Sequence, residues 1–140
     1  GIEAVCEAVT MLAAGNAPRI KQTEEGASYE PPLNKEHLKI NWDESLEIHR
    51  RKIRAGNPGI GAITELRKKQ VHIYGSQRTE GKPLADVKAG TIIKIDSEGI
   101  YVNCIDGILK LTVLCFEGSK KTAAHDFAIE NSIKVNEVFN

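Results

Sequence analysis

The spacing of apolar residues in this 140-residue chain changes at Gly59, from the period of a helix to that of a β-strand. Beyond it apolar and polar residues alternate, which places the apolar ones on one face of each strand. We predict a hairpin over residues 61–77 with Arg67-Lys68-Lys69 at its turn, and three short strands within residues 90–118. Asp106-Gly107 is a tight-turn signal between the last two strands. Five strands with one apolar face predict an α+β, mainly β domain: a small, OB-like, partly open barrel with flanking helices.

The alternation also predicts which side chains face the core. A loop is expected over residues 82–87, a helix over residues 122–131 anchored by Phe127, and a final extended piece over residues 135–139. The inward side chains are expected to be Ile100, Val102 and Cys104 on the middle strand of the three, and Leu109, Leu111, Val113 and Cys115 on the last.

A first helical segment precedes this region. Residues 1–15 have apolar residues at helical spacing, and Gly15 followed by Pro18 ends the pattern. No capping residue precedes Ile2, so we expect this helix to be part of something longer. Residues 16–34 are expected to form an extended strap, because a residue before proline is disfavoured in the helical conformation.

A second helix is expected from Asp43 or Glu44 to Ala55. Asp43 is the expected cap of its first-turn amides, and Gly56 and Pro58 end it. The inward face is expected to carry Leu46, His49 and Ile53, with Trp42 packed at the base of the helix.

The composition argues against several classes of protein. With 19 basic and 19 acidic residues the chain lacks the positive charge of a dedicated nucleic-acid binder, although a local basic patch stays open. No run of about 18 apolar residues is present to span a membrane, and no targeting segment is recognised. Cys6, Cys104 and Cys115 lack CxxC spacing, so neither a disulfide framework nor a zinc site is expected. Buried thiols in a reducing, cytosolic compartment are the default expectation.

Neither the histidines nor the thiols form a catalytic motif. The four histidines lack helical i, i+4 spacing and paired carboxylates, so no metal or general-base role is expected for them. His49 is expected to pack in its helix and hydrogen-bond the strap, and Trp42 to be a packing anchor between strap and barrel. Cys104 and Cys115 fall on the inward side of their strands and are expected to be core thiols. The remaining histidines are His37, His72 and His125.

Four segments carry a resemblance to a known family. They are Gly1–Asp43, Ile53–Glu65, Gly90–Leu111 and Glu117–Phe127, and the most specific match joins Gln22 and Ala27-Ser28-Tyr29 to Ile40-Asn41-Trp42-Asp43. The chain resembles the C-terminal portion of the 10-formyltetrahydrofolate-dependent formyltransferases. That family includes methionyl-tRNA formyltransferase, the hydrolase part of 10-formyltetrahydrofolate dehydrogenase and the sugar-nucleotide formyltransferases.

The resemblance implies a division of the chain. Residues 1–15 would be the last helix of a missing catalytic domain, residues 16–33 a linker, and residues 34–140 the C-terminal OB-like domain. In the family, 10-formyltetrahydrofolate binding and formyl transfer belong to the upstream domain, whose catalytic Asn, His and Asp have no counterpart here. The resemblance therefore implies no catalytic, cofactor-binding or metal-binding residue in this chain, and a parent protein that is an enzyme of one-carbon metabolism.

The resemblance also implies an accessory role. The domain would complete the enzyme in the cytoplasm, or in mitochondria if the source is eukaryotic, and a contact with the acceptor, tRNA or a sugar nucleotide, stays open. In tRNA-specific members this domain is thought to present a positive face to tRNA. The candidates here are a basic cluster of Arg50, Arg51, Lys52, Arg54, Arg67, Lys68 and Lys69.

Two other hypotheses stay open. The chain could be a stand-alone OB-like module that binds tRNA or another polyanion through the basic cluster. Alternatively it could be a structural domain that docks on a partner and exposes Val5, Val9 and Leu12 when alone. The alternative explanation of the basic cluster involves no ligand, because a helix end and a hairpin turn both favour exposed Lys and Arg.

Overall fold

The computed structural model describes residues 1–21, 23–29 and 31–140. The chain divides into two compact units, residues 1–31 and residues 32–140, and each is described here by itself. Gln22, which belongs to the resemblance noted above, lies outside the described residues.

The first unit contains one helix, α1 (Ile2–Ala13). It ends as predicted at Gly15, whose positive φ of 67° lets the chain turn back. The amide of Gly15 donates to the carbonyl of Leu12, and that of Asn16 to the carbonyl of Met11, the pair of bonds typical of a glycine-ended helix. No residue of α1 is buried within the chain, so its apolar side chains face water here.

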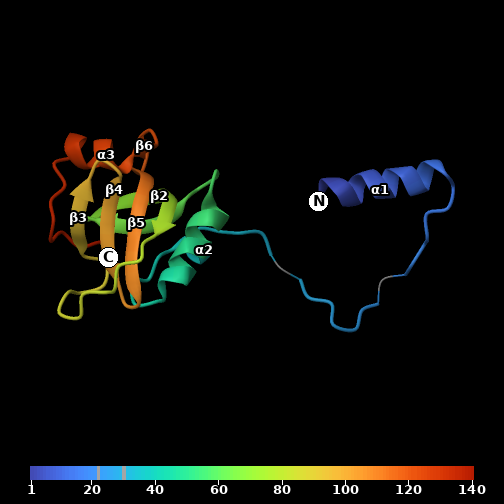
Figure 1. The fold of residues 1–140 in the computed structure, drawn as a ribbon, viewed down its shortest axis with the longest axis horizontal. Coiled ribbons are helices and arrows are strands. Elements are labelled where there is room, and N and C mark those ends of the chain that lie inside the picture. Colours follow the sequence, from blue (N-terminus) through green and yellow to red (C-terminus); the bar gives the residue numbers. More distant parts are fainter. Residues whose placement is uncertain (22, 30) are drawn as a thin grey trace. The chain divides into compact units, whose positions relative to one another are not determined.

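The second unit is built on one antiparallel sheet, which confirms the α+β, mainly β prediction. Its strand order is β1-β2-β5-β4-β3, with β6 paired to β5 (Figure 1). The sheet has six strands rather than five and is open rather than closed into a barrel, because β1 and β3 do not pair. The strands are β1 (Ala62–Leu66), β2 (Lys69–Arg78), β3 (Ile92–Asp96), β4 (Gly99–Cys104), β5 (Gly107–Phe116) and β6 (Thr122–Ala123).

The C-terminal tail, residues 136–140, hydrogen-bonds to both edge strands of this open sheet. At the β3 edge the amide of Phe139 donates to the carbonyl of Gly90 (2.9 Å), and that of Ile92 to the carbonyl of Glu137 (2.8 Å). At the β1 edge Glu65 and Asn140 exchange two bonds of 2.9 Å. The expected final extended piece is confirmed from Glu137 onward, while residues 135 and 136 form a turn. The tail satisfies edge groups that would otherwise stay unpaired.

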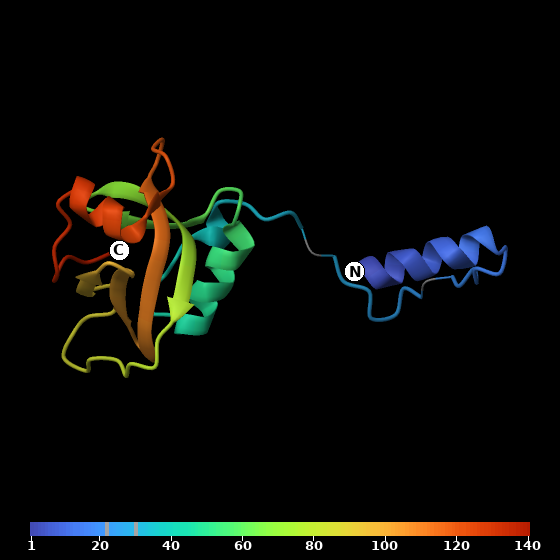
Figure 2. The ribbon, with the colours of Figure 1, turned by 45° about the horizontal axis from the view of Figure 1, so that its top comes forward.

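Three helices flank the sheet: η1 (Glu36–Leu38), α2 (Leu46–Gly56) and α3 (Ala124–Glu130). In Figures 1 and 2, α2 covers one side of β2 and α3 lies at the end of β5 that also carries β6. The start of α3 was predicted too early, because Thr122 and Ala123 pair with β5 instead of beginning the helix. In the part of the chain that the structure describes, no helix has the length and apolar character to cross a bilayer.

The start of α2 was also predicted two to three residues too early. Its first turn is capped from another element: the Leu46 amide donates to a carboxylate oxygen of Asp106, 60 residues away, at 2.8 Å. Asp43, the expected cap, instead lies before the helix, where its amide donates to Asn41. The cap of α2 is therefore supplied by the turn that contains Asp106, which reaches the helix only when the sheet has folded.

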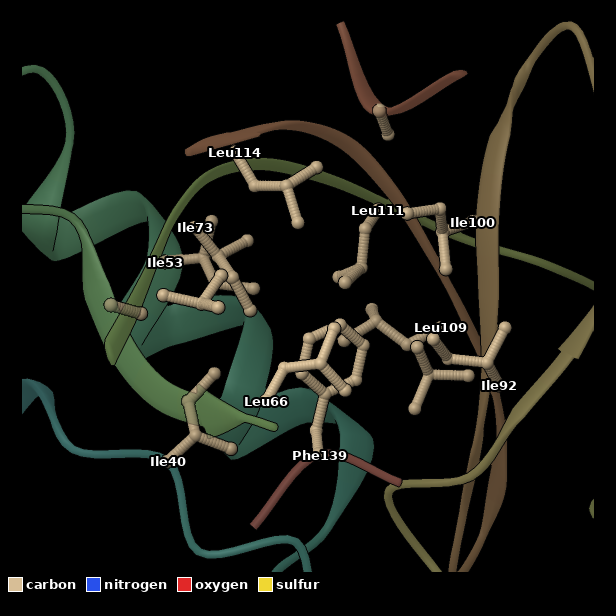
Figure 3. Packing of buried hydrophobic residues seen from close by; sticks show 14 of the residues in the cluster. Ile40, Ile53, Leu66, Ile73, Ile92, Ile100, Leu109, Leu111, Leu114 and Phe139 are labelled. Carbon is tan, nitrogen blue, oxygen red and sulfur yellow. The ribbon is translucent and has the colours of Figure 1, made fainter. Parts of the chain in front are cut away.

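The core lies between the sheet, α2, α3 and the tail, and Figure 3 shows part of it. Most of the predicted inward side chains are fully buried, and Phe127 is 3% exposed, so these predictions are confirmed. Val113 was assigned wrongly: a bulge between β2 and β5 leaves Thr112 without a paired residue, so that Leu114 is buried in its place. Cys115 is buried but lies outside the main core cluster.

Candidate functional site

The four basic residues of α2 lie among carboxylates. Arg50, Arg51 and Arg54 approach the same carboxylate, Glu47, at 3.1, 3.4 and 3.6 Å. Burial alone would raise the pKa of Glu47, but the charges and hydrogen bonding of the three arginines together lower it. Lys52 bonds to Glu44 (2.5 Å) and to the Lys39 carbonyl (2.8 Å). Three guanidinium groups around one carboxylate leave an excess of positive charge on this face.

Arg67, in the β1–β2 turn, is a structural clamp. Its guanidinium forms a two-pronged pair with Glu137, at 2.6 and 2.5 Å, and donates to the carbonyls of Asn131 and Ser132. The bond with Glu137 raises the pKa of Arg67 and lowers that of Glu137. The hairpin is thereby tied to the tail, and this guanidinium has few donors left for a ligand.

Of the other two basic residues of the hairpin, Lys69 lies over an aromatic ring. Lys68 has a positive φ of 61° in the turn and is exposed. The Lys69 ammonium lies 5.5 Å from the centroid of the Phe116 ring. Among the described residues no hydrogen bond or ion pair joins the hairpin members of the basic cluster to its α2 members. The basic cluster therefore consists of two separate groups, one on α2 and one on the hairpin.

The predicted packing of His49 and Trp42 is confirmed, but the partners found for them lie in the second unit and not in the strap of residues 16–34. His49 has no exposed surface, and its Nε2 lies 2.9 Å from the Asn41 carbonyl, in the segment that leads into the domain. The Trp42 indole N–H donates to Thr64 (3.0 Å), and its ring stacks on Phe139 with centroids 5.7 Å apart. Burial lowers the pKa of His49, more than the bond to Asn41 raises it.

The remaining histidines and cysteines were the other candidates for a chemical role. His72 contacts the Ile60 carbonyl at 2.7 Å and His125 the Asp96 carbonyl at 2.9 Å. Burial raises the pKa of the Cys104 thiol to about 12, which makes it a poor nucleophile. Cys6 is exposed, against the default expectation of a buried thiol. Within the described residues no three metal-ligating side chains gather.

A groove that the sequence analysis missed lies beside the β1–β2 turn. Two adjoining cavities, of ≈ 470 and ≈ 170 Å³, share Phe116, Ser119 and Asn131 among their lining residues, and we name them together the Phe116 groove. Val71 pairs with Phe116 across β2 and β5, which brings this ring to the basic hairpin. Residues 69 and 116 are far apart in the chain, so no spacing motif could have signalled their contact.

Comparison with known proteins places this architecture in a family. Residues 32–132 match the family described as "Formyl transferase, C-terminal domain". The chain belongs to this family. The match covers most of the second unit and starts after α1, near the end of the strap.

Relatives of known name agree with this assignment. The chain is 30% identical over 123 residues to the methionyl-tRNA formyltransferase of Delftia acidovorans, covering 88% of the chain and 38% of that protein. It is 43% identical over 86 residues to the cytosolic 10-formyltetrahydrofolate dehydrogenase of Xenopus laevis, covering 61% of the chain and 10% of that protein. For the human mitochondrial 10-formyltetrahydrofolate dehydrogenase the identity is 37% over 133 residues, which cover 91% of the chain and 14% of that protein. The chain thus spans well under half the length of these relatives.

Solved structures show the same fold. A variant of HypX from Aquifex aeolicus superposes with a TM-score of 0.77 at 21% identity, over 97% of this chain and 24% of that one. HypX in complex with tetrahydrofolic acid gives a TM-score of 0.76 at 20% identity, over 96% and 23%.

Proposed function

We propose that this chain is the accessory part of a 10-formyltetrahydrofolate-dependent formyltransferase or formyl hydrolase. Residues 1–15 are the last helix of an upstream catalytic domain, residues 16–33 the linker and residues 34–140 the domain that completes the enzyme. Formyl transfer and the folate site then lie upstream of this chain. The family match over residues 32–132 is the observation that carries the proposal.

The chemistry of the second unit supports an accessory role. In the described residues every buried side-chain nitrogen or oxygen has a hydrogen-bond partner, so none of these buried groups is left unpaired to bind a substrate. The one thiol in the core, Cys104, is held protonated by burial. His49 and His72 are engaged with backbone carbonyls.

The apolar stripe of α1 supports attachment to an upstream domain. Val5, Val9 and Leu12 are 62%, 58% and 68% exposed, although they lie on one face of the helix. An apolar helix face is stable in water only when another surface covers it. In our proposal the catalytic domain supplies that surface.

The test compares three proteins in one assay: the native gene product, the same product without residues 34–140, and the present chain alone. Tetrahydrofolate release from 10-formyltetrahydrofolate is measured with and without acceptor. We expect turnover by the native product, reduced turnover without residues 34–140, and none by the chain alone. Turnover by the chain alone would refute the accessory role. A native product of only 15.4 kDa on an immunoblot would refute it as well.

A second candidate function rests on the arginines around Glu47. Three guanidinium groups that share one carboxylate can bind phosphates of tRNA or another polyanion, in the parent enzyme or alone. We expect tRNA binding that weakens steeply with salt and is lost on charge reversal of Arg50 and Arg51. Charge reversal of Arg67 is not a clean test, because it also removes the clamp on Glu137. Binding that is insensitive to salt, or absent at low salt, would exclude this function.

A further inference from the structure

The extended part of the tail, residues 137–140, closes the open sheet through contacts that any copy of the same segment can make. Its backbone groups bond to Ile92 and Gly90 at one edge of the sheet and to Glu65 at the other. Phe139 is the buried side chain of this segment, and its ring points into the core (Figure 3). Backbone bonds at a sheet edge do not depend on which molecule supplies the added segment. The same segment of a second copy of this chain therefore fits the same place.

Three exposed residues, 134–136, join this segment to the rest of the domain, and we name them the hinge. Ile133, just before the hinge, is buried in the core and stays with the sheet. The hinge turns tightly, because the Glu137 amide donates to the Lys134 carbonyl at 3.3 Å. Within the turn Asn136 has a φ of 73°, a left-handed conformation that is unfavourable for a residue with a Cβ. A short hinge held in an unfavourable conformation is the setting in which copies of a protein exchange segments.

The Arg67 clamp spans this hinge but does not decide between closed and exchanged tails. Its guanidinium donates to the carbonyls of Asn131 and Ser132, which precede the hinge, and pairs with Glu137, which follows it. A tail from a second copy brings an identical glutamate to the same position, so the clamp forms again. A contact that two states share cannot shift the equilibrium between them. The hinge and the protein concentration are what set the balance.

We propose that residues 137–140 exchange between two copies of this chain, so that each copy closes the sheet of the other. In the exchanged form the hinge straightens, gives up its turn and spans about 10 Å. Asn136 then leaves the left-handed region. Each copy donates the segment that it receives, which produces a closed two-fold dimer. This inference concerns the second unit alone and does not rest on the accessory role proposed above.

The experiment traps the tail where it lies. Glu65 and Asn140 exchange both of their backbone bonds, which brings their Cα atoms within the range of a disulfide. The whole chain therefore carries Glu65→Cys and Asn140→Cys, together with Cys6→Ser because Cys6 is exposed. It is refolded from urea at low and at high concentration, oxidised and run on a non-reducing gel. A closed tail gives a cross-linked monomer, and an exchanged tail gives a covalent dimer whose share rises with concentration.

Substitutions at the hinge are expected to move this balance in opposite directions. Asn136→Val should make the dimerisation constant roughly tenfold larger, because a β-branched residue disfavours the left-handed conformation strongly. Asn136→Gly should make it smaller, because glycine adopts this conformation freely. Ser132→Val is the matched control, since Ser132 also has a positive φ, of 50°, but lies before the buried Ile133 and keeps its conformation in both forms. It should leave the share of dimer unchanged.

Two further controls make the readout specific. The chain with Glu65→Cys and Cys6→Ser but with Asn140 intact measures random cross-linking, including that between copies held together by the exposed face of α1. Its yield of covalent dimer is subtracted. Trp42 fluorescence verifies that each variant has refolded, and Asn136→Ala takes the place of Asn136→Val if the latter does not refold.

Three results would overturn the proposal. One is that no covalent dimer above the control forms at any concentration, in Asn136→Val as well. Another is that Ser132→Val raises the share of dimer as much as Asn136→Val. The third is that Asn136→Gly exchanges as readily as Asn136→Val, which would show that the hinge conformation has no influence. None of these results bears on formyl transfer by the native gene product, so the two proposals fail independently.

Discussion

At the scale of single residues, His49 shows how burial couples this fold to pH. Its imidazole has no exposed surface and packs against Trp42, with ring centroids 5.0 Å apart. Burial lowers the pKa of His49 below the 6.5 of an unfolded chain. The unfolded chain therefore binds a proton more readily than the folded one. It follows that the free energy of unfolding contributed by His49 is intact above pH about 6.5 and falls as the pH drops below it.

The prediction is a loss of stability between pH 7.5 and 5 that depends on His49. Urea unfolding, followed by Trp42 fluorescence, should give a free energy of unfolding that decreases over this range. In His49→Gln, which cannot take up a proton, the decrease should be smaller, although the variant is less stable at pH 7.5. Equal pH dependence in both proteins would contradict the account.

At the scale of elements, α2 depends on a cap from the β4–β5 turn. Asp106→Ala removes the acceptor of the Leu46 amide and is expected to cost about 1 kcal/mol of unfolding free energy. Asp106→Asn, which keeps an acceptor oxygen, should lose less. Asp43→Ala is the control, because Asp43 is exposed and lies before the helix, and it should change stability by less than about 0.5 kcal/mol. Urea unfolding measures all three, and equal losses for Asp43→Ala and Asp106→Ala would exclude the cap.

The tail is the second element whose role can be measured. Phe139 is 1% exposed and stacks on Trp42, while its backbone bonds to Gly90. Phe139→Ala is expected to cost about 3–5 kcal/mol, which is enough to unfold a marginally stable domain. Val135→Ala is the control immediately before the tail, since Val135 is 45% exposed, and it should cost less than about 0.5 kcal/mol. If the two variants melted at the same temperature, the tail would not be part of the core.

At the scale of the whole molecule, the two units should be thermodynamically separate. Every residue of the core cluster belongs to the second unit, so this core is complete without residues 1–31. We predict that residues 32–140 alone melt within about 2 °C of residues 1–140, because a domain loses stability only when buried contacts are removed. Calorimetry of the two proteins gives the comparison. A melting temperature lower by 5 °C or more without residues 1–31 would show that they stabilise the second unit.

Local pattern predicted most of the elements but few of the contacts between them. The alternation around Val102 and Leu109 predicted their strands and their burial, because the period of a strand is a local property. The bulge near Thr112 interrupted that alternation, so that Leu114 is buried and Val113 only half-buried, and no residue type in the strand indicates this bulge. The cap at Asp106 and the ring at Phe116 were missed for the same reason, since both act on segments remote in the chain.

The sequence by itself determined the order of the first five strands, most of their inward faces, the packing of Trp42 and His49 and, through its resemblance, the family. These follow from side-chain periodicity and turn residues, which act within a few neighbours. Only the tertiary structure decided that the sheet stays open, that the tail binds both of its edges, and that the basic cluster falls into two groups. Backbone pairing and ion pairs between distant segments form only when the whole domain has packed, so no short stretch of sequence encodes them alone.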